Sequence, residues 1–365
     1  MKICYLADVT SAHTKKWCKF FLAKGYEIVI ISLTSGEIPG CKVYDFNVGD
    51  TIHKSDFNKL FSYFGKIKRV RELIREENPD IIHAHYATSY GLLGSLLNFK
   101  PYILSVWGSD VYDFPRRSFI HRWLLKHNLK SPTLLMSTST DMKKEIQKYT
   151  KRDVLVTYFG VDPQVYKPLK GVKKEGIFTI GTIKSLFKVY GLEYLVKAFK
   201  LLVEKYPQDR FKLILAGKGE EEANLKALVK ELEIENSVEF PGYLSIENLV
   251  KTYNLMDIAV FPSLQESFGV SAVEAQSCGV PVVATDVGGL PEATSPGKSS
   301  LLVKPENEVE LFQAMEKLFL ERELRENMGH NGRKYVLEKF VLEENFSRID
   351  KIYHSVLKGE VNEIY

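Results

Sequence analysis

Two glutamates, Glu266 and Glu274, stand eight residues apart in the segment FPSLQESFGVSAVEAQSCGVPVVATDVGGLPE (261–292). The pattern predicts a strand at its start and a helix that begins near Phe268 and Gly269. At about 100° per residue, eight residues bring Glu274 back near the side of the helix entrance. A helix N-terminus has unpaired N–H groups and about half a positive charge, which favours phosphate. Beside such a site, Glu266 is predicted to face a hexose and Glu274 a ribose.

Each glutamate also has an ordinary structural interpretation. Glu266 could simply stabilise the helix dipole, and Glu274 could be a solvated helix position. The surrounding residues decide between the two interpretations, because they resemble the signature of family 4 glycosyltransferases of the GT-B fold. That pattern is P-S-x-x-E-x-F-G-x-x-x-x-E-A, then G-x-P-V-V-A-T, then G-G and P-E. The matching residues are Pro262, Ser263, Glu266, Phe268, Gly269, Glu274, Ala275, 279–285, Gly288, Gly289, Pro291 and Glu292.

Three other stretches resemble the same family, so that the resemblance covers essentially the whole chain: FGVD (159–162), LAGKGEE (216–222) and PGYL (241–244). The resemblance implies that the second domain binds a nucleotide-sugar. Glu274 would bind the ribose hydroxyls, and Glu266 would contact the transferred sugar. The backbone of residues 268–270 would hold the distal phosphate and sugar. The donor-binding residues implied in this way are Phe268, Gly269, Val270, Glu274, Gly242 and Tyr243.

The charge of a leaving diphosphate needs a counter-charge. No DxD motif for a metal is found, and no metal or cofactor is expected, since the nucleotide-sugar is a co-substrate. Relatives instead use an Arg–Lys pair in G-R-x-x-x-x-K-G, whereas this chain has G-T-I-K-S-L-F-K-V-Y-G (181–191). Thr182 stands at the arginine position, so Lys184 and Lys188 are the candidates for stabilising the phosphate. The alternative is that both are exposed loop lysines.

The first domain is expected to bind the acceptor. His13 and Thr14 follow the first predicted strand and could approach the phosphates or the acceptor, and His85 resembles part of an H-x-H-Y stretch. Many relatives have H-G-x-D after the next strand, where this chain has Trp107 followed by Gly-Ser-Asp. Tryptophan cannot relay a proton, so His85 or Asp110 is predicted to take that role, or the leaving phosphate accepts the proton itself.

The elements that must position these residues are apolar, β-branched runs alternating with helical stretches, which predicts parallel sheets covered on both faces. We therefore predict an α/β protein of the GT-B type, two Rossmann-like domains with a cleft between them. The domains are predicted at 1–166 and 167–343, with a linker at 159–176 and an amphipathic helix at 344–358 crossing back to the first domain. The predicted strands are 2–7, 27–33, 80–85, 102–107, 133–138, 177–183, 211–217, 238–240, 258–263, 280–285 and 301–305.

The charge is unevenly divided. Residues 1–168 hold 25 basic and 16 acidic residues, a net +9, whereas the remainder has a net −5. Two basic stretches with interleaved aromatic or apolar residues, 59–73 and 115–130, suggest docking on an anionic membrane surface; the alternative is a buried apolar face with solvated charges. No nucleic-acid-binding module is found. Four isolated cysteines and no long apolar run favour the cytoplasm, with attachment to the inner membrane face as a further hypothesis.

The resemblance implies a retaining, metal-independent, hexosyltransferase-type enzyme that uses a UDP-sugar, or next a GDP-sugar. The acceptor would be a glycan or a lipid-linked hydroxyl, in surface polysaccharide, glycolipid or cell-envelope glycan synthesis. Two alternatives remain open. One is a catalytically silent GT-B scaffold that binds nucleotide, motivated by Trp107. The other is a dinucleotide-dependent oxidoreductase, against which stands the missing G-x-G-x-x-G, since the closest match (217–222) ends in glutamate.

Overall fold

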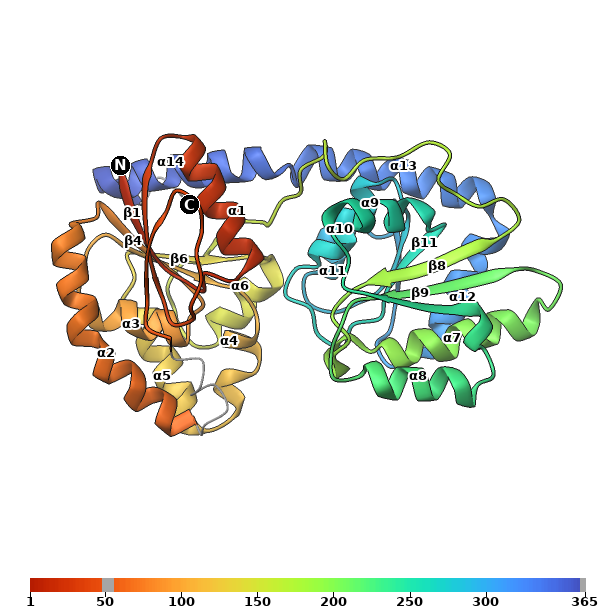
Figure 1. Cartoon of the computed structure of the whole chain (residues 1–365), viewed down its shortest axis with the longest axis horizontal. Coiled ribbons are helices and arrows are strands. Elements are labelled where there is room, and N and C mark those ends of the chain that lie inside the picture. The colour runs from red at the N-terminus through yellow and green to blue at the C-terminus, as the bar shows by residue number, and fades with distance from the viewer. Residues whose placement is uncertain (48–55, 362–365) are drawn as a thin grey trace. The chain divides into compact units, whose positions relative to one another are not determined.

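The computed structural model describes residues 1–47 and 56–361, without the side chains of residues 56–64. The chain divides into two compact units (Figure 1). Unit 1 comprises Met1–Tyr158 and the C-terminal helix from Glu343 onward, and unit 2 comprises Phe159–Leu342. The boundary therefore lies before residue 159 rather than after 166. The reason is that the 159–166 segment packs on unit 2: Val161 bridges Val341, and the Tyr166 carbonyl accepts a hydrogen bond from Ser277.

Unit 1 is built on a seven-stranded parallel sheet in the order β3-β2-β1-β4-β5-β6-β7. Helices cover both faces, so the central strands β4 and β5 are buried along their whole length. Its strands are β1 (Lys2–Leu6), β2 (Glu27–Ser32), β3 (Lys42–Asp45), β4 (Ile81–His85), β5 (Tyr102–Val106), β6 (Leu134–Ser137) and β7 (Leu155–Val156). Its helices are α1 (Ala12–Ala23), α2 (Asp56–Glu77), α3 (Ser89–Leu97), α4 (Ser109–Tyr112), η2 (Phe114–Arg116), α5 (Phe119–Lys130), α6 (Thr140–Gln147) and α14 (Leu342–Lys358).

Unit 2 is also built on a parallel sheet, which has six strands in the order β10-β9-β8-β11-β12-β13. Its strands are β8 (Phe178–Ile183), β9 (Phe211–Ala216), β10 (Val238–Gly242), β11 (Ile258–Phe261), β12 (Val282–Thr285) and β13 (Ser300–Val303). Its helices are η3 (Lys188–Tyr190), α7 (Leu192–Lys205), α8 (Glu222–Glu231), η4 (Glu235–Ser237), α9 (Ile246–Leu255), α10 (Val270–Ser277), α11 (Leu290–Thr294), α12 (Glu308–Leu320) and α13 (Arg322–Lys339).

The buried strands agree with the predicted ranges to within a few residues, whereas β3 and β7 were not predicted. Both lie at the edges of the unit 1 sheet, and β3 is only partly buried while β7 has two residues. An edge strand has a partner on one side only, so it does not need the continuous apolar run by which the other strands were found.

Helix α14 packs on unit 1 through Phe346, Ile349, Ile352, Tyr353 and Val356. Phe346 lies edge-on to Trp17, with ring centroids 5.3 Å apart. The Tyr353 hydroxyl is 2.6 Å from His83 Nδ1 in the core of the sheet. Near the end of this helix, Val356 is buried whereas Leu357 is exposed.

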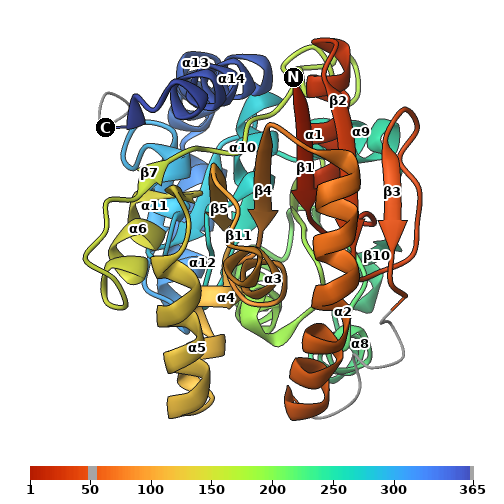
Figure 2. The ribbon, with the colours of Figure 1, turned by 90° about the vertical axis from the view of Figure 1, so that its left-hand side faces the viewer.

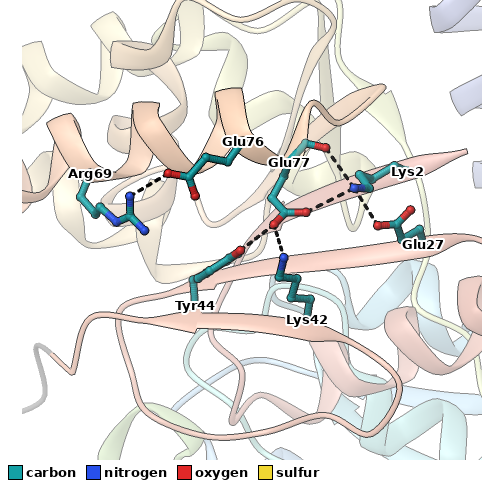
Figure 3. A network of polar contacts seen from close by, with 7 residues as sticks. All are labelled: Lys2, Glu27, Lys42, Tyr44, Arg69, Glu76 and Glu77. Atoms are coloured by element: carbon teal, nitrogen blue, oxygen red, sulfur yellow. Dashed lines mark hydrogen bonds and ion pairs between the residues drawn. The ribbon is translucent and has the colours of Figure 1, made fainter.

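A buried carboxylate joins α2 to the sheet edge in unit 1 (Figure 3). Glu77 Oε1 accepts hydrogen bonds of 2.5 Å from both Lys42 Nζ and the Tyr44 hydroxyl on β3. Its other oxygen lies 3.2 Å from Lys2 Nζ, which also pairs with Glu27 at 2.7 Å. The hydrogen bond from Lys42, followed by that from Tyr44, lowers the pKa of Glu77 to about 2.

Acid should therefore weaken unit 1 through Glu77. Because its pKa in the folded protein lies below the unfolded value of about 4.3, its stabilisation is present above about pH 5 and is lost as the pH falls toward 2. Glu77→Gln should lower the free energy of unfolding at pH 7 by about 1–3 kcal/mol and flatten this pH dependence. Urea unfolding followed between pH 3 and pH 7 checks both. An unchanged slope in the variant would show that other carboxylates dominate.

Candidate functional site

The candidate site in unit 2 forms at the point where its strand order reverses. The first strand of unit 2, β8, lies between β9 and β11. After β8 the chain continues to β9 on one side, whereas after β11 it continues to β12 on the other side. Ligands of open parallel sheets bind in the crevice outside the strand ends at such a point. Ala259 on β11 is in register with Gly181 on β8. This pairing brings together the loops that carry Glu266 and Lys184, which are remote in sequence.

Lys184 and Glu266 form a buried ion pair, with Lys184 Nζ 2.5 Å from Glu266 Oε2. Their side chains are only 13% and 9% exposed. The Lys184 ammonium also lies over the ring of Tyr190, 4.2 Å from its centroid. Burial by itself would lower the pKa of Lys184, but the carboxylate of Glu266 and the other nearby acidic groups raise it above its ordinary value. The lysine is therefore a fixed cation.

Backbone packing holds this pair in place. Gly288 has a φ of +52°, and a β-carbon there would collide with the carbonyl oxygen of Glu266. The same carbonyl accepts a hydrogen bond of 3.1 Å from the Gly289 N–H. Gly217, with a φ of +144°, approaches the Lys184 carbonyl just as closely. The G-G and G-K-G motifs thus allow neighbouring loops to touch backbone to backbone, which positions Lys184 and Glu266.

The turn before α10 presents backbone rather than side chains. Phe268 is buried with its ring edge-on to Phe340, at 5.3 Å. Gly269 caps the helix with a φ of +102° and offers no side chain to the first N–H groups of α10. These groups and the helix dipole therefore remain suited to an anion at Gly269 and Val270.

Glu274 lies on α10 with two tyrosines near it. The Tyr253 hydroxyl is 3.1 Å from both Glu274 Oε2 and the Ser271 carbonyl oxygen, and it donates to one of them. Burial, and next the charge of Glu274, raises the pKa of Tyr166. Glu274 is thus a largely buried carboxylate held by hydroxyl groups, not a solvated helix residue.

The structure separates the two candidate lysines. Lys188 is exposed on η3, and within the described residues no carboxylate pairs with it. Thr182 is fully buried, and its hydroxyl has no hydrogen-bond partner among the described residues.

The two residues predicted beside the base lie at the β10 edge of the sheet. Gly242 ends β10 with a φ of +72°, and the following Tyr243 is 83% exposed.

In unit 1, aromatic rings gather at the carboxyl ends of β1, β4 and β5. His85 is 1% exposed, and its ring centroid lies 4.5 Å from that of Trp107 and 4.9 Å from that of Trp17. His13 lies edge-on to Trp107 at 5.7 Å. Neither ring nitrogen of His85, nor the buried hydroxyl of Thr14, has a hydrogen-bond partner among the described residues. Burial holds the pKa of His85 well below its ordinary value, so the ring is neutral.

The carboxylate of Asp110 accepts hydrogen bonds from backbone N–H groups in this cluster. Its carboxylate accepts hydrogen bonds of 2.7 Å from the N–H groups of Gly108 and Ala87, and a longer one of 3.3 Å from Trp107. Burial raises the pKa of Asp110 to about 6 even though these bonds favour the charged form. Both oxygens thus accept hydrogen bonds that fix the loop that carries Trp107, and the catalytic role of Asp110 stays a prediction.

Comparisons with known proteins identify the chain. The family described as Glycosyl transferases group 1 matches residues 168–335, and Glycosyl transferase 4-like matches residues 2–139. An uncharacterised glycosyltransferase of Methanocaldococcus jannaschii is 33% identical over 355 residues, covering 90% of this chain and 89% of the relative. The chain belongs to glycosyltransferase family 4.

Solved structures of this transferase's relatives agree on the fold. Sucrose-phosphate synthase of Thermosynechococcus elongatus superposes with a TM-score of 0.87 at 18% identity, over 98% of this chain and 100% of that structure. The Anabaena protein HepE, solved in complex with UDP and glucose, superposes with a TM-score of 0.78 at 20% identity, over 97% and 100%. The predicted α/β architecture of the GT-B type, with two parallel-sheet domains, is confirmed. The oxidoreductase alternative is set aside by family membership.

Three tyrosines that were not predicted lie near the charged residues of unit 2 in this transferase: Tyr166, Tyr190 and Tyr253. Only Tyr190 carried a signal, because it lies in the same loop as Lys184. Tyr166 and Tyr253 come from the start of unit 2 and from α9, and only the fold brings them to α10. Among the described residues, no group of three or more His, Cys, Asp or Glu side chains is arranged to hold a metal ion.

Proposed function

We propose that this transferase moves a hexose from a nucleotide-diphospho-sugar to an acceptor hydroxyl with retention of the anomeric configuration. A UDP-sugar is the first choice of donor and a GDP-sugar the second. The observation that carries the proposal is the buried Lys184–Glu266 pair in the same unit as the uncapped N-terminus of α10. A cation and a set of free N–H groups suit a diphosphate, and a carboxylate suits sugar hydroxyls.

The chemistry follows from the charges. The bond between the anomeric carbon and the diphosphate oxygen breaks, and negative charge accumulates on the departing nucleoside diphosphate. Lys184 would leave Glu266 for the distal phosphate, and the released carboxylate would accept hydrogen bonds from the sugar. The acceptor oxygen then bonds to the anomeric carbon on the face that the diphosphate leaves, and its proton passes to a phosphate oxygen. No metal is needed in this scheme, because lysine and helix N–H groups supply the stabilisation.

The rest of the donor would occupy unit 2. Glu274, held by the Tyr253 hydroxyl, would accept hydrogen bonds from the ribose. The exposed ring of Tyr243 beside Gly242 would stack on the base. The complex of HepE with UDP and glucose supports a uridine donor by analogy of fold.

The acceptor would bind to unit 1 near His13, Thr14 and His85. The two unpartnered ring nitrogens of His85 offer one donor and one acceptor to an incoming hydroxyl. Its low pKa makes His85 a weak base, which favours proton transfer to the leaving phosphate. We propose a glycan or lipid-linked acceptor, in surface polysaccharide, glycolipid or cell-envelope glycan synthesis.

A thermal-shift panel of nucleotides and nucleotide-sugars tests the donor. Stabilisation by UDP or GDP and their sugars, but not by nicotinamide dinucleotides, is expected. The preferred donor is then used to find an acceptor, and NMR of the anomeric proton in the first product gives the stereochemistry. A product of inverted configuration would refute retention, and loss of activity in EDTA would refute metal independence.

A second candidate, a catalytically silent nucleotide-binding scaffold, is favoured by Trp107 at the position of a histidine in relatives. Hydrolysis of the donor without acceptor separates the two. The enzyme should hydrolyse the donor slowly, and Glu266→Ala should reduce that rate while the exposed Glu231→Ala does not. The scaffold would be favoured if the wild type and both variants bound the donor but neither hydrolysed it nor transferred its sugar to any acceptor tested.

A further inference from the structure

Helix α5 exposes large apolar side chains to solvent. Phe119 is 81% exposed and Trp123 63%, and Ile120 beside them is 42% exposed. Phe119 and Trp123 are one turn apart and therefore share a face. The opposite face of the helix is packed on the core through Leu125 and Leu129. The alternative that these aromatic residues belong to the core is thus wrong for Phe119 and Trp123.

Positive charge surrounds these aromatic rings. The stretch 115–130 has five basic residues and no acidic one: Arg116, Arg117, Arg122, Lys126 and Lys130. Arg116 contacts Glu145 at 3.5 Å, and Arg122 lies over the ring of Tyr149. Lys126 and Lys130 form no ion pair within the described residues, and with Phe119 and Trp123 they occupy the outward face. We call Phe119, Trp123, Lys126 and Lys130 the α5 face.

The second basic stretch is different. Arg69 on α2 is paired with Glu72 at 3.3 Å. It is also paired with Glu76 at 3.0 Å (Figure 3). Arg71 donates to the Leu96 carbonyl, and Val70 is buried in the core. The side chains of residues 59–64, which belong to the predicted stretch 59–73, lie outside the described residues. In the described part of α2, Arg69 and Arg71 are thus engaged within unit 1, Lys68 and Arg75 are exposed, and no large apolar side chain is exposed beside them.

The position of α5 ties this face to the acceptor side of unit 1. Helix α5 lies in the crossover that joins β5 to its parallel neighbour β6, so its first residue, Phe119, is expected toward the edge of the sheet where the strands end. Figure 2 shows α5 extending past the carboxyl end of β4. That edge carries His85, and it is where ligands of parallel sheets bind.

We infer that the α5 face docks the transferase on an anionic lipid bilayer. Phe119 and Trp123 enter the headgroup region, and Lys126 and Lys130 contact lipid phosphates, as in interfacial helices. The charge of the stretch decides this occupant, because an uncharged apolar partner would leave the basic residues unpaired. Docking would place the acceptor edge of unit 1 beside the membrane. This inference does not depend on the donor proposed above.

Flotation of the full chain with vesicles tests the inference. Binding is expected to phosphatidylcholine vesicles containing about a third phosphatidylglycerol at about 10 mM salt, where electrostatic attraction reaches about 30 Å. Release is expected at about 1 M salt, where that distance is about 3 Å. Failure to bind the anionic vesicles at low salt would overturn the inference, as would equal binding to pure phosphatidylcholine.

Substitutions on the α5 face test whether this helix is the part of the chain that binds the vesicles. Lys126→Glu with Lys130→Glu should weaken partitioning by at least about 30-fold, since each basic residue near an anionic surface contributes about a fivefold attraction. Phe119→Ala with Trp123→Ala should weaken it by about tenfold or more. Matched controls are the exposed pairs Lys230→Glu with Lys251→Glu, and Val309→Ala with Leu320→Ala, in unit 2. Equal losses in a control and its α5 counterpart would refute the assignment, whereas loss confined to the α5 variants, with unchanged thermal midpoints, supports it.

Discussion

Lys184→Met is expected to lower kcat by about 10²- to 10³-fold while changing the KM for the donor far less, because the lysine charge matters most when the diphosphate departs. The ammonium is held at 2.5 Å from Glu266 and over the ring of Tyr190. In the proposed mechanism, this ammonium passes from Glu266 to the departing phosphate. Initial rates at varied donor concentration, with donor hydrolysis as the readout if no acceptor is yet known, measure the effect.

The loss must be separated from damage to the fold. Removal of one member of a buried ion pair leaves the other charge unpaired and can cost about 3–5 kcal/mol. The double variant with Glu266→Gln removes both charges, so it should regain stability but not activity. Lys188→Met, on the exposed turn of η3, should reduce kcat less than Lys184→Met does. A larger loss of kcat from Lys188→Met than from Lys184→Met would show that Lys188, not Lys184, stabilises the phosphate.

Gly288→Ala should be strongly destabilising, and it should also reduce transfer. A β-carbon at this residue would collide with the Glu266 carbonyl oxygen, and a φ of +52° is itself unfavourable for alanine. Together these effects should lower the free energy of unfolding by about 2–5 kcal/mol. Relief of the collision would move the Glu266 loop, so kcat should fall in the protein that still folds. Thermal or urea unfolding and initial rates provide the two measurements.

Gly297→Ala is the matched control. Gly297 also has a positive φ, +77°, but nothing lies within 4 Å of where its β-carbon would be. Its substitution should show only the backbone cost, about 1–2 kcal/mol, with transfer unchanged. If Gly288→Ala were no more destabilising than Gly297→Ala, the packing of the glycine loop on Glu266 would not hold the site.

Much of the architecture was predictable because its causes are local. Central strands of a parallel sheet are buried on both faces, so 27–33 and 102–107 appear as short runs in which most residues are apolar. The strand, turn and helix around Glu266 were predictable for a similar reason, since a glycine in the turn and the spacing to Glu274 are short-range requirements. The edge strands β3 and β7 lack such a signal.

The sequence by itself determined the family, the two-domain α/β plan and the residues with suitable chemistry. Only the tertiary structure decided which of them act on one another. It paired Lys184 rather than Lys188 with Glu266, because β8 lies beside β11. It committed both oxygens of Asp110 to backbone N–H groups and left the rings of Phe119 and Trp123 in solvent. The physical reason is that hydrogen bonding and burial depend on neighbours far along the chain, and residue type and spacing do not specify these neighbours.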